Sequence, residues 1–495
     1  MDSQTSLLRE QRKLQRLRCS VQCYDWGRRG QHSRVAGLFA RNTGSEIQPD
    51  KPYAELWMGT HESGPSFVVQ TSVDNGVSVG SEGVSLKSWV SENPGALGDK
   101  VLDEWGCDLP FLFKVLSVAK ALSIQAHPDK ELARTMHKAR PDVYKDDNHK
   151  PEMALAITEF EALCGFISLE FMANVGFPSI FLCGKRERKK KKCVIPSLLK
   201  TGYFCLGIVS AELKDVLRNV PEIVELVGSA DANRILHLDE QDEEEKAKSV
   251  LRSTFTQLML ASKETITEAV SKIKSRLHKE SQSDLIVMRT LQADTHFLLH
   301  MTRKLPFSLM EVIVVVTGGH EENTGEAINR QGTAGVALNP GEALYLGANE
   351  PHAYIFGECI ECMATSDNVV RAGLTPKHRD VQTLCSMLTY KQGLPEILQG
   401  IPVNSYVTRY LPPFDEFEVD RCILPHGAST VFPAVPGPSV FLVMVGEGVM
   451  HAGSLKGVVV TEGDVVFAPA NTEISITSAS ELQLYRAGVN SRFFQ

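Results

Sequence analysis

The sequence has no long apolar run, no secretory leader and no excess of positive charge. No window approaches the roughly 20 consecutive apolar residues that span a bilayer. Residues 1–21 include basic side chains, but they lack the apolar centre and cleavage signal of a secretory peptide. The net charge of −8 gives no overall attraction to nucleic acid or to anionic lipid. We therefore expect a cytoplasmic protein with neither a membrane nor a nucleic-acid partner.

The sequence also lacks a disulfide framework. Its eleven cysteines form an odd set without regular spacing, which fits reduced thiols in a cytosolic protein. Cys359 and Cys362 are the most closely spaced pair. A zinc site made of cysteines would need a second such pair, and a reactive thiol would need a preceding helix N-terminus, so we interpret this pair as structural.

Size and composition are those of an ordinary globular protein. A chain of 495 residues is long enough for two to four domains, each with a core of its own. The contents of 43% hydrophobic and 23% charged residues are typical of such proteins. Because the overall charge is negative, an anionic substrate would need arginine and lysine side chains placed locally.

Ligand-type side chains alternate in two strand-like segments. Ser123, Gln125 and His127 are two residues apart, so they would point to the same side of an extended strand. The proline after Lys150 favours an extended backbone, so Lys150 and Glu152 would also share a face. An imidazole, an amide oxygen and a carboxylate from two strands could together bind a divalent ion such as zinc.

A further candidate ligand, His352, is found far downstream. Residues 340–354 read PGEALYLGANEPHAY, with a Pro-Gly turn, an apolar strand, a Gly-Ala-Asn break and then Pro351 and His352. By itself such a histidine is more often a hydrogen-bonded loop residue than a ligand. Together with the two segments above, it predicts a metal-binding residue at the mouth of a small antiparallel barrel.

Strand patterns dominate the N-terminal quarter of the chain. Residues 19–125 read mostly as strands, and residues 110–127 form a nearly continuous β run that Lys114 interrupts. A lone lysine in an apolar strand either protects an exposed sheet edge or supplies a cation to a pocket. Its place just before the proposed ligands favours the pocket.

The pattern becomes helical between residues 211 and 277. Leu251, Phe255 and Leu258 repeat at helical spacing, and a second such set follows them. Thr265, with a glutamate three residues later, fits a capping box at the start of the second helix. We therefore expect a helical insertion here.

From about residue 401 the chain again reads as short strands separated by turns, as in a jelly roll or barrel. Residues 463–476, GDVVFAPANTEISI, read as the same strand-turn-strand unit as residues 341–354. They have Ile474 at the place of His352. The second barrel therefore lacks this ligand, and we expect it to be structural.

Two segments fit none of these patterns. Residues 171–210 include the basic run 185–192, and residues 292–334 contain an apolar strand followed by a polar Gly/Asn-rich stretch. A basic cluster of this length can be a nuclear address or a nucleic-acid patch. Because it has no interleaved aromatic residues and no surrounding nucleic-acid fold, we interpret residues 171–210 as an exposed insert.

With these residues in place, the chain resembles the type I phosphomannose isomerases (mannose-6-phosphate isomerases), a family of cupin-fold zinc enzymes. The matching blocks are CSVQCYDWG, KPYAELWMGTH, LPFLFKVLSV, LSIQAHPDKELA, NHKPEMALA, PGEALYLGANEPHAY and ECMATSDNVVRAGLTPK. The last two blocks are plant-like. Residues 171–210 are extra relative to the family pattern, and residues 292–334 replace a strand of it.

The resemblance implies a mainly β fold with a catalytic cupin domain, a helical domain inserted in it and a C-terminal jelly roll. We place the parts as follows along the chain: residues 19–165, first part of the catalytic cupin; 171–210, atypical basic insert; 211–290, helical domain; 292–334, atypical segment; 335–390, second part of the cupin; and 401–495, C-terminal jelly roll.

The resemblance also implies a reaction. Gln125, His127, Glu152 and His352 would be the ligands of one zinc ion per chain, and Arg371 would be an active-site arginine whose donor fork suits an enediolate or a phosphate. The reaction implied is the interconversion of mannose 6-phosphate and fructose 6-phosphate through a cis-enediol, which supplies mannose 6-phosphate for GDP-mannose synthesis. Zinc with one anionic ligand keeps a positive charge and could stabilise the enediolate. We expect a monomer.

Proton transfer next to a carbonyl needs a base whose pKa lies near neutrality. Lys150 is the first candidate, because it shares a face with Glu152 and a nearby dication would lower the pKa of Lys150. His149 is the alternative, although in a regular strand it would face away. Ser123, Lys114 and Lys377 are candidates for binding the substrate.

Two other classes remain open. Cupin oxygenases hold iron with two histidines and a carboxylate, but Gln125 would fill the position that oxygen needs. A non-catalytic cupin variant is the second alternative, because residues 292–334 stand where the family has a barrel strand. Metal analysis distinguishes the first class, and a coupled isomerase assay on this chain distinguishes the second.

Overall fold

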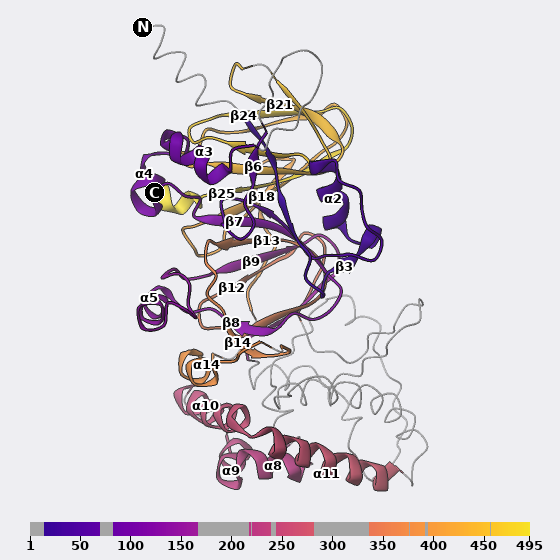
Figure 1. The fold of residues 1–495 in the computed structure, drawn as a ribbon, viewed down its shortest axis with the longest axis vertical. Helices are drawn as coiled ribbons and strands as arrows, with labels where there is room; N and C mark the ends of the chain where they lie inside the picture. Colours follow the sequence, from indigo (N-terminus) through magenta and orange to yellow (C-terminus); the bar gives the residue numbers. More distant parts are fainter. Residues whose placement is uncertain are drawn as a thin grey trace.

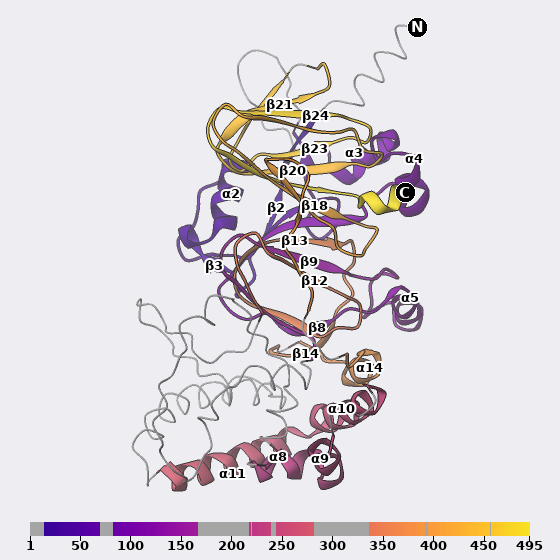
Figure 2. The same cartoon turned by 180° about the vertical axis from the view of Figure 1, so that it is seen from behind.

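The structure is a computed structural model of the chain. It describes residues 14–69, 83–166, 217–218, 220–238, 244–281, 336–375, 377–391, 395–455 and 457–495. The expected insert at 171–210 and the atypical segment at 292–334 lie outside the described residues. Along its long axis the molecule has the C-terminal strands at one end, a β-barrel in the middle and helices at the other end (Figures 1 and 2).

The middle layer is built on one long, bent sheet. Its main path contains, in spatial order, β15 (Ile397–Leu398), β12 (Ala343–Leu346), β9 (Glu152–Ala156), β13 (His352–Ala364), β7 (Phe111–Val118), β5 (Glu55–Met58) and β2 (Ser20–Gln22). Three further strands extend it from β13, namely β10 (Phe160–Cys164), β8 (Ile124–Ala126) and, beyond β8, β14 (Val370–Gly373). The short strand β11 (Val336–Leu338) pairs with β10.

Strand β13 closes the barrel by changing partners along its length. Its first residues pair with β10, and the residues from Gly357 onward pair with β7 and β9. Gly357 has a φ of 114°, and a Cβ there would lie 2.4 Å from the carbonyl oxygen of Glu159. Only glycine fits this bend without strain. The bend brings His352, at the start of β13, over the strands that hold the other candidate ligands.

The C-terminal layer consists of two sheets. The larger contains β16 (Ile401–Pro402), β17 (Val407–Tyr410), β18 (Glu418–Leu424), β25 (Leu482–Gly488), β20 (Ser439–Val445), β23 (Val465–Ala468), β1 (Gln15–Arg18) and β6 (Phe67–Val68). The smaller contains β19 (Ser429–Phe432), β24 (Ile474–Ser478), β21 (Glu447–Ala452) and β22 (Val458–Thr461). A separate two-stranded sheet pairs β3 (Arg28–Arg29) with β4 (Pro52–Tyr53). The sequence did not indicate that β1 and β6 belong with the C-terminal strands.

Helices cover the outside of both layers and form the far end of the molecule. They are α2 (Arg34–Thr43), α3 (Leu86–Glu92), α4 (Asp99–Trp105), α5 (Lys130–Ala139), α8 (Pro221–Val227), α9 (Ser229–Leu236), α10 (Glu244–Leu260), α11 (Lys263–Ser281) and α14 (Val381–Met387). Among the helices of the described residues, none combines the length and apolar character needed to cross a membrane. The predicted helical insertion is confirmed for its described part.

Two local predictions were wrong. Helix α11 begins at Lys263, and the Ser262 hydroxyl accepts a hydrogen bond of 3.1 Å from the amide of Thr265, so the cap precedes the position we predicted. The β run expected over residues 110–127 is two strands, β7 and β8, separated by residues 119–123. Residues 119–121 of this linker are exposed, and Leu122 packs against the barrel core.

The core explains why β7 reads as an unbroken apolar strand. All eight of its residues are buried. One face, with Phe113 and Val115, packs against the C-terminal sheet, and the other, with Leu116 and Val118, fills the barrel. A strand that is buried on both faces loses the usual alternation of apolar and polar residues. The mainly β cupin and jelly-roll fold predicted from the sequence is confirmed.

The repeated unit seen in the sequence is also repeated in the structure. Strand β12 and strand β23 occupy equivalent places in their copies, and each follows a glycine with positive φ, Gly341 at 95° and Gly463 at 90°. In each copy an asparagine with a φ near 60° lies three residues before the next strand. That strand starts with His352 in one copy and with the buried Ile474 in the other.

Candidate metal centre

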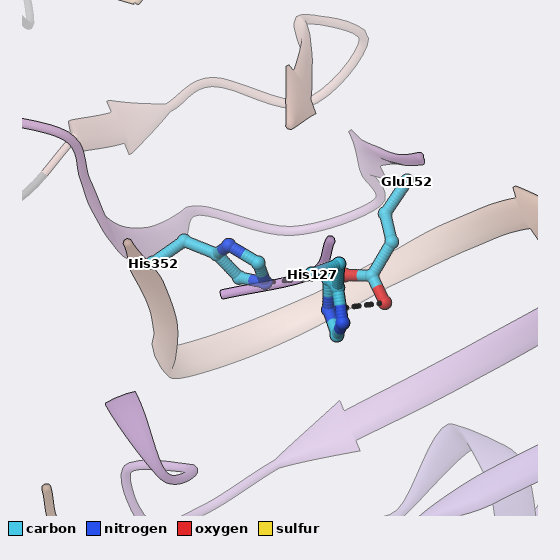
Figure 3. A group of neighbouring side chains, drawn as sticks. All are labelled: His127, Glu152 and His352. Atoms are coloured by element: carbon cyan, nitrogen blue, oxygen red, sulfur yellow. Dashed lines mark ion pairs between the residues drawn. The ribbon is translucent and has the colours of Figure 1, made fainter. Parts of the chain in front are cut away.

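Three ligand-type side chains meet inside the barrel. Nε2 of His127 lies 3.2 Å from one carboxylate oxygen of Glu152, and Nε2 of His352 lies 3.4 Å from the other. The side chains of all three residues are at most 2% exposed. Figure 3 shows both rings directed at the carboxylate. His127 directly follows β8, Glu152 begins β9 and His352 begins β13, so three strand ends supply the cluster.

Hydrogen bonds on the outer nitrogens fix both imidazole rings. Nδ1 of His127 lies 2.6 Å from the carbonyl oxygen of Asn368, and Nδ1 of His352 lies 3.1 Å from that of Glu350. A carbonyl oxygen only accepts, so each Nδ1 donates a proton. Burial lowers the pKa of His127 to about 4, so its ring is neutral near pH 7. Its Nε2 therefore presents a lone pair to Glu152, and His352 has the same tautomer when it is neutral.

The facing atoms fit a cation. Nε2 of His127, Nε2 of His352 and Oε2 of Glu152 are buried without a hydrogen-bond partner, and the ligand atoms of the three residues lie within 4.8 Å of one another. Lone pairs facing one another in a dry site are unfavourable unless a positive charge lies between them. Two imidazole nitrogens and one carboxylate oxygen are a ligand set that zinc accepts. No second group of this kind occurs among the described residues.

The carboxylate of Glu152 is kept ionised. Burial alone would raise its pKa, but positive charge beside it, from His127 when that ring is protonated and from Lys150, holds the pKa well below the ordinary value. Nζ of Lys150 lies 3.4 Å from Oε1 of Glu152, which agrees with the prediction that these two residues share a face. The lysine is mostly buried, and it is directed at the same carboxylate as the two histidines.

Gln125 lies beside the cluster. It is the direct cross-strand partner of His352 on one side and of Arg371 on the other. Opposed residues in an antiparallel pair point to the same side of the sheet, so the three side chains share a face. The Ser123 hydroxyl donates a hydrogen bond of 3.3 Å to Oε1 of Gln125, as the alternation from Ser123 predicted.

Arg371 is half-buried and has no hydrogen-bond or ion-pair partner among the described residues. Burial lowers the pKa of its guanidinium, because little compensates for the water it has lost. Lys377, by contrast, is exposed, and among the described residues only its backbone amide has a partner, the Thr375 hydroxyl at 3.1 Å. The structure therefore brings Arg371 to the site face and leaves the Lys377 side chain at the surface.

Lys114 lies inside the barrel, in a strand paired on both sides, so the sheet-edge interpretation is wrong. Its Nζ is 2.7 Å from Glu361 and 3.4 Å from Glu55. It also lies 5.1 Å from the ring centre of Trp57, whose indole donates to Glu55. Burial would lower the pKa of Lys114, but the two carboxylates raise it above its ordinary value. Sequence analysis missed both acids, although their strand alternation places them on the Lys114 face.

His149 faces away from the cluster, as expected for a residue between Asn148 and Lys150 in an extended segment. Its Nε2 donates a hydrogen bond of 2.6 Å to Glu416, in the loop before β18. Sequence analysis did not identify Glu416, because nothing near it in the chain indicates this distant partner. Cys359 and Cys362 are not suited to bind a metal, because burial raises the pKa of both thiols and keeps them protonated.

Helix α5 is tied to both histidine-bearing segments. Asp129 caps the helix by accepting a hydrogen bond of 2.9 Å from the amide of Leu132, and its other oxygen accepts one of 2.8 Å from the side chain of Asn349. The amide of Asn349 in turn donates to the carbonyl oxygen of His127 at 2.7 Å. The loops before β13 and after β8 are therefore held together next to the candidate ligands.

A barrel with a buried His-Glu-His cluster defines a metal-binding cupin. Comparison with known proteins gives the family. The model of the type I phosphomannose isomerase catalytic domain matches residues 14–169. Mannose-6-phosphate isomerase 1 of Arabidopsis thaliana is 53% identical over 485 residues, which cover 98% of this chain and 96% of that protein. The human mannose-6-phosphate isomerase is 34% identical over 481 residues, or 95% and 97% of the two chains. The chain belongs to the mannose-6-phosphate isomerase family.

Solved structures agree on the fold. The crystal structure of mannose 6-phosphate isomerase from Salmonella typhimurium bound to fructose 6-phosphate and zinc has a TM-score of 0.63 to this chain at 22% identity. The match covers 96% of this chain and 99% of that one. The greater identity to the Arabidopsis protein than to the human one agrees with the plant-like character of two sequence blocks.

Proposed function

We propose that this protein is a zinc-dependent isomerase that interconverts mannose 6-phosphate and fructose 6-phosphate through a cis-enediol. The observation that supports it most directly is the buried cluster of His127, Glu152 and His352, whose facing atoms have no other partner. Membership of the family, at 53% identity over nearly the whole chain, agrees with this chemistry. A related isomerase of the same fold has been solved with zinc.

The proposed zinc ligands are His127, Glu152, His352 and Gln125. The first three supply two neutral nitrogens and one anionic oxygen. Gln125 is the candidate for the fourth, because it is the cross-strand neighbour of His352 and shares its face. When bound, zinc acts as a Lewis acid that stabilises negative charge on substrate oxygens. A site with a single carboxylate leaves most of the ion's charge for that purpose.

Lys150 is the proposed general base. It is mostly buried, and its Nζ lies 3.4 Å from the carboxylate of Glu152, so it is on the reacting side of the barrel. A neutral amine at this place would take a proton from one carbon of the sugar and return it to the neighbouring carbon. His149 is the weaker alternative, because its Nε2 is already hydrogen-bonded to Glu416.

Arg371 is the proposed anion-binding residue. A guanidinium that is half-buried, shares a face with Gln125 and lacks a partner among the described residues is free to bind an enediolate oxygen or a phosphate. Ser123 and Lys114 face the same interior, and Lys377 would approach from the surface. We also propose that the protein acts as a monomer in the cytoplasm.

A coupled assay on the full chain tests the proposal. Fructose 6-phosphate formed from mannose 6-phosphate is followed with zinc present and again after chelation. We expect turnover that is lost on chelation and restored by zinc. A chain with bound zinc but no turnover would point to a non-catalytic cupin, and iron in the purified protein would point to an oxygenase.

A further inference from the structure

The C-terminal jelly roll contributes one buried carboxylate to the edge of the candidate site. Glu416, between β17 and β18, is 1% exposed. Its Oε1 accepts a hydrogen bond of 2.6 Å from Nε2 of His149 and lies 3.2 Å from Nζ of Lys130. Burial alone would raise the pKa of Glu416, but these two partners lower it to about 2, so the carboxylate is ionised at neutral pH.

The loop that holds Glu416 is fixed at both ends. The side chain of Asn490 donates hydrogen bonds of 3.0 Å and 3.1 Å to the carbonyl oxygens of Pro412 and Phe417. The ring of Phe414 packs edge-on against Tyr345 of β12, with 5.8 Å between ring centres. Glu416 is therefore presented to the barrel from a rigid support.

His149 is the residue directly before Lys150. On its other side, the backbone oxygen of Asn148 accepts hydrogen bonds from the side chains of Ser366, at 3.1 Å, and Asn368, at 2.9 Å. These bonds fix the chain before His149, and the bond from Glu416 fixes the His149 side chain itself. The position of the Lys150 backbone thus depends on a contact that comes from the other domain.

We propose that Glu416 is a positioning residue of the isomerase, which holds His149 and through it sets the place of Lys150 in the site. This inference rests on the proposed function, in which Lys150 is the base. A misplacement of about 1 Å at a reacting group can cost on the order of 100-fold in rate, so a tether one residue from the base affects turnover more than substrate binding.

Two substitutions of Glu416 test the proposal with the full-length zinc-loaded protein. Glu416→Ala removes the acceptor, and we expect kcat to fall about 10- to 100-fold. KM for mannose 6-phosphate and the zinc content should stay close to those of the parent. Glu416→Gln keeps an oxygen that can accept from Nε2 of His149, and we expect it to restore kcat to within about threefold of the parent, since a charged hydrogen bond is replaced by a neutral one.

Two matched controls distinguish a displaced His149 side chain from a general weakening of the contact between the C-terminal strands and the barrel. Phe414→Leu weakens the packing that supports the Glu416 loop but keeps the hydrogen bond to His149, so thermal stability falls while kcat falls much less than in Glu416→Ala. Lys130→Met removes the other partner of Glu416, and we expect kcat within about twofold of the parent, as is usual at a partly exposed side chain. In a His149→Ala background, Glu416→Ala should cause no further loss of kcat.

Three outcomes would overturn the inference. They are an unchanged kcat in Glu416→Ala, a loss of zinc together with activity in that variant, and an equal loss in Glu416→Gln and Glu416→Ala. A parent protein with no isomerase activity would instead contradict the proposed function. If the parent is active and the Lys150→Ala variant also turns over normally, Lys150 is not the base. A fall in kcat in Glu416→Ala would then need another explanation.

Discussion

The backbone oxygen of Asn368 lies 2.6 Å from Nδ1 of His127 and so determines which nitrogen of that ring faces Glu152. Asp146 holds the segment that presents this oxygen. Its carboxylate accepts hydrogen bonds from the Ser366 hydroxyl at 2.7 Å and from the Asp367 amide at 2.8 Å. A metal ligand that is held in this way depends on residues that never touch the ion.

Asp146→Asn should therefore weaken zinc binding by about 10- to 100-fold, the range usual for residues that orient metal ligands. The loss comes from a less firmly held Asn368 carbonyl, which allows the His127 ring to turn. Competition with a chromophoric chelator measures the affinity. Asp147→Asn is the matched control, because this neighbour is exposed, and it should bind zinc as the parent does. Equal affinities in the two variants would contradict the role of Asp146.

Arg371→Ala should lower turnover by at least about 100-fold, since it removes a preorganised donor of charge-assisted hydrogen bonds. Zinc should remain bound at one ion per chain, because among the described residues Arg371 makes no hydrogen bond or ion pair with His127, Glu152 or His352. Steady-state kinetics and metal analysis of the same preparation check both points. Arg134→Ala, at an exposed place on α5, serves as the control. Loss of zinc together with activity would show that Arg371 is structural.

Lys114→Met should destabilise the protein by about 3–5 kcal/mol, because removing one member of a buried ion pair leaves uncompensated charge. Glu361 and Glu55 would then lie unpaired within the barrel. Urea unfolding of the zinc-loaded protein measures the change. The double variant Lys114→Met, Glu361→Gln should recover part of the loss. Lys120→Met, at an exposed site just after the same strand, should have little effect.

The stability of the zinc-free protein should fall as the pH decreases from 6.5 towards 4. Burial lowers the pKa of His127 from 6.5 to about 4, so in this range the unfolded chain binds a proton that the folded chain does not. The slope from one such group is at most about 1.4 kcal/mol per pH unit. Above pH 6.5 this contribution is fully present and constant. Urea unfolding of chelated protein at a series of pH values measures it.

His127→Gln provides the reference for that experiment, because it cannot take up the proton. Its stability should depend less on pH between 6.5 and 5. Below about pH 4.5, buried carboxylates add their own dependence: the lowered pKa of Glu416, about 2, means that its contribution is lost only in stronger acid. If the parent and His127→Gln have the same slope between pH 6.5 and 5, His127 is not the group responsible.

The sequence by itself determined which side chains share a face and where the strands turn. Alternation along an extended chain placed Ser123, Gln125 and His127 on one face of their segment. It placed Lys150 and Glu152 on one face of theirs, because the two-residue repeat of a strand is a local property. The repeated unit at residues 341–354 and 463–476 was visible for the same reason. Each copy has its glycine and asparagine where the backbone takes a positive φ.

Only the tertiary structure decided which faces meet. The partners of Lys114 lie in other strands, one of them 247 residues away, and the acceptor for His149 lies 267 residues away in the loop before β18. Strand pairing depends on burying apolar surface over the whole chain, so no short window contains the information that joins β1 to β23 or β8 to β13. Local spacing determined the donors of the site, and global packing brought them together around Glu152.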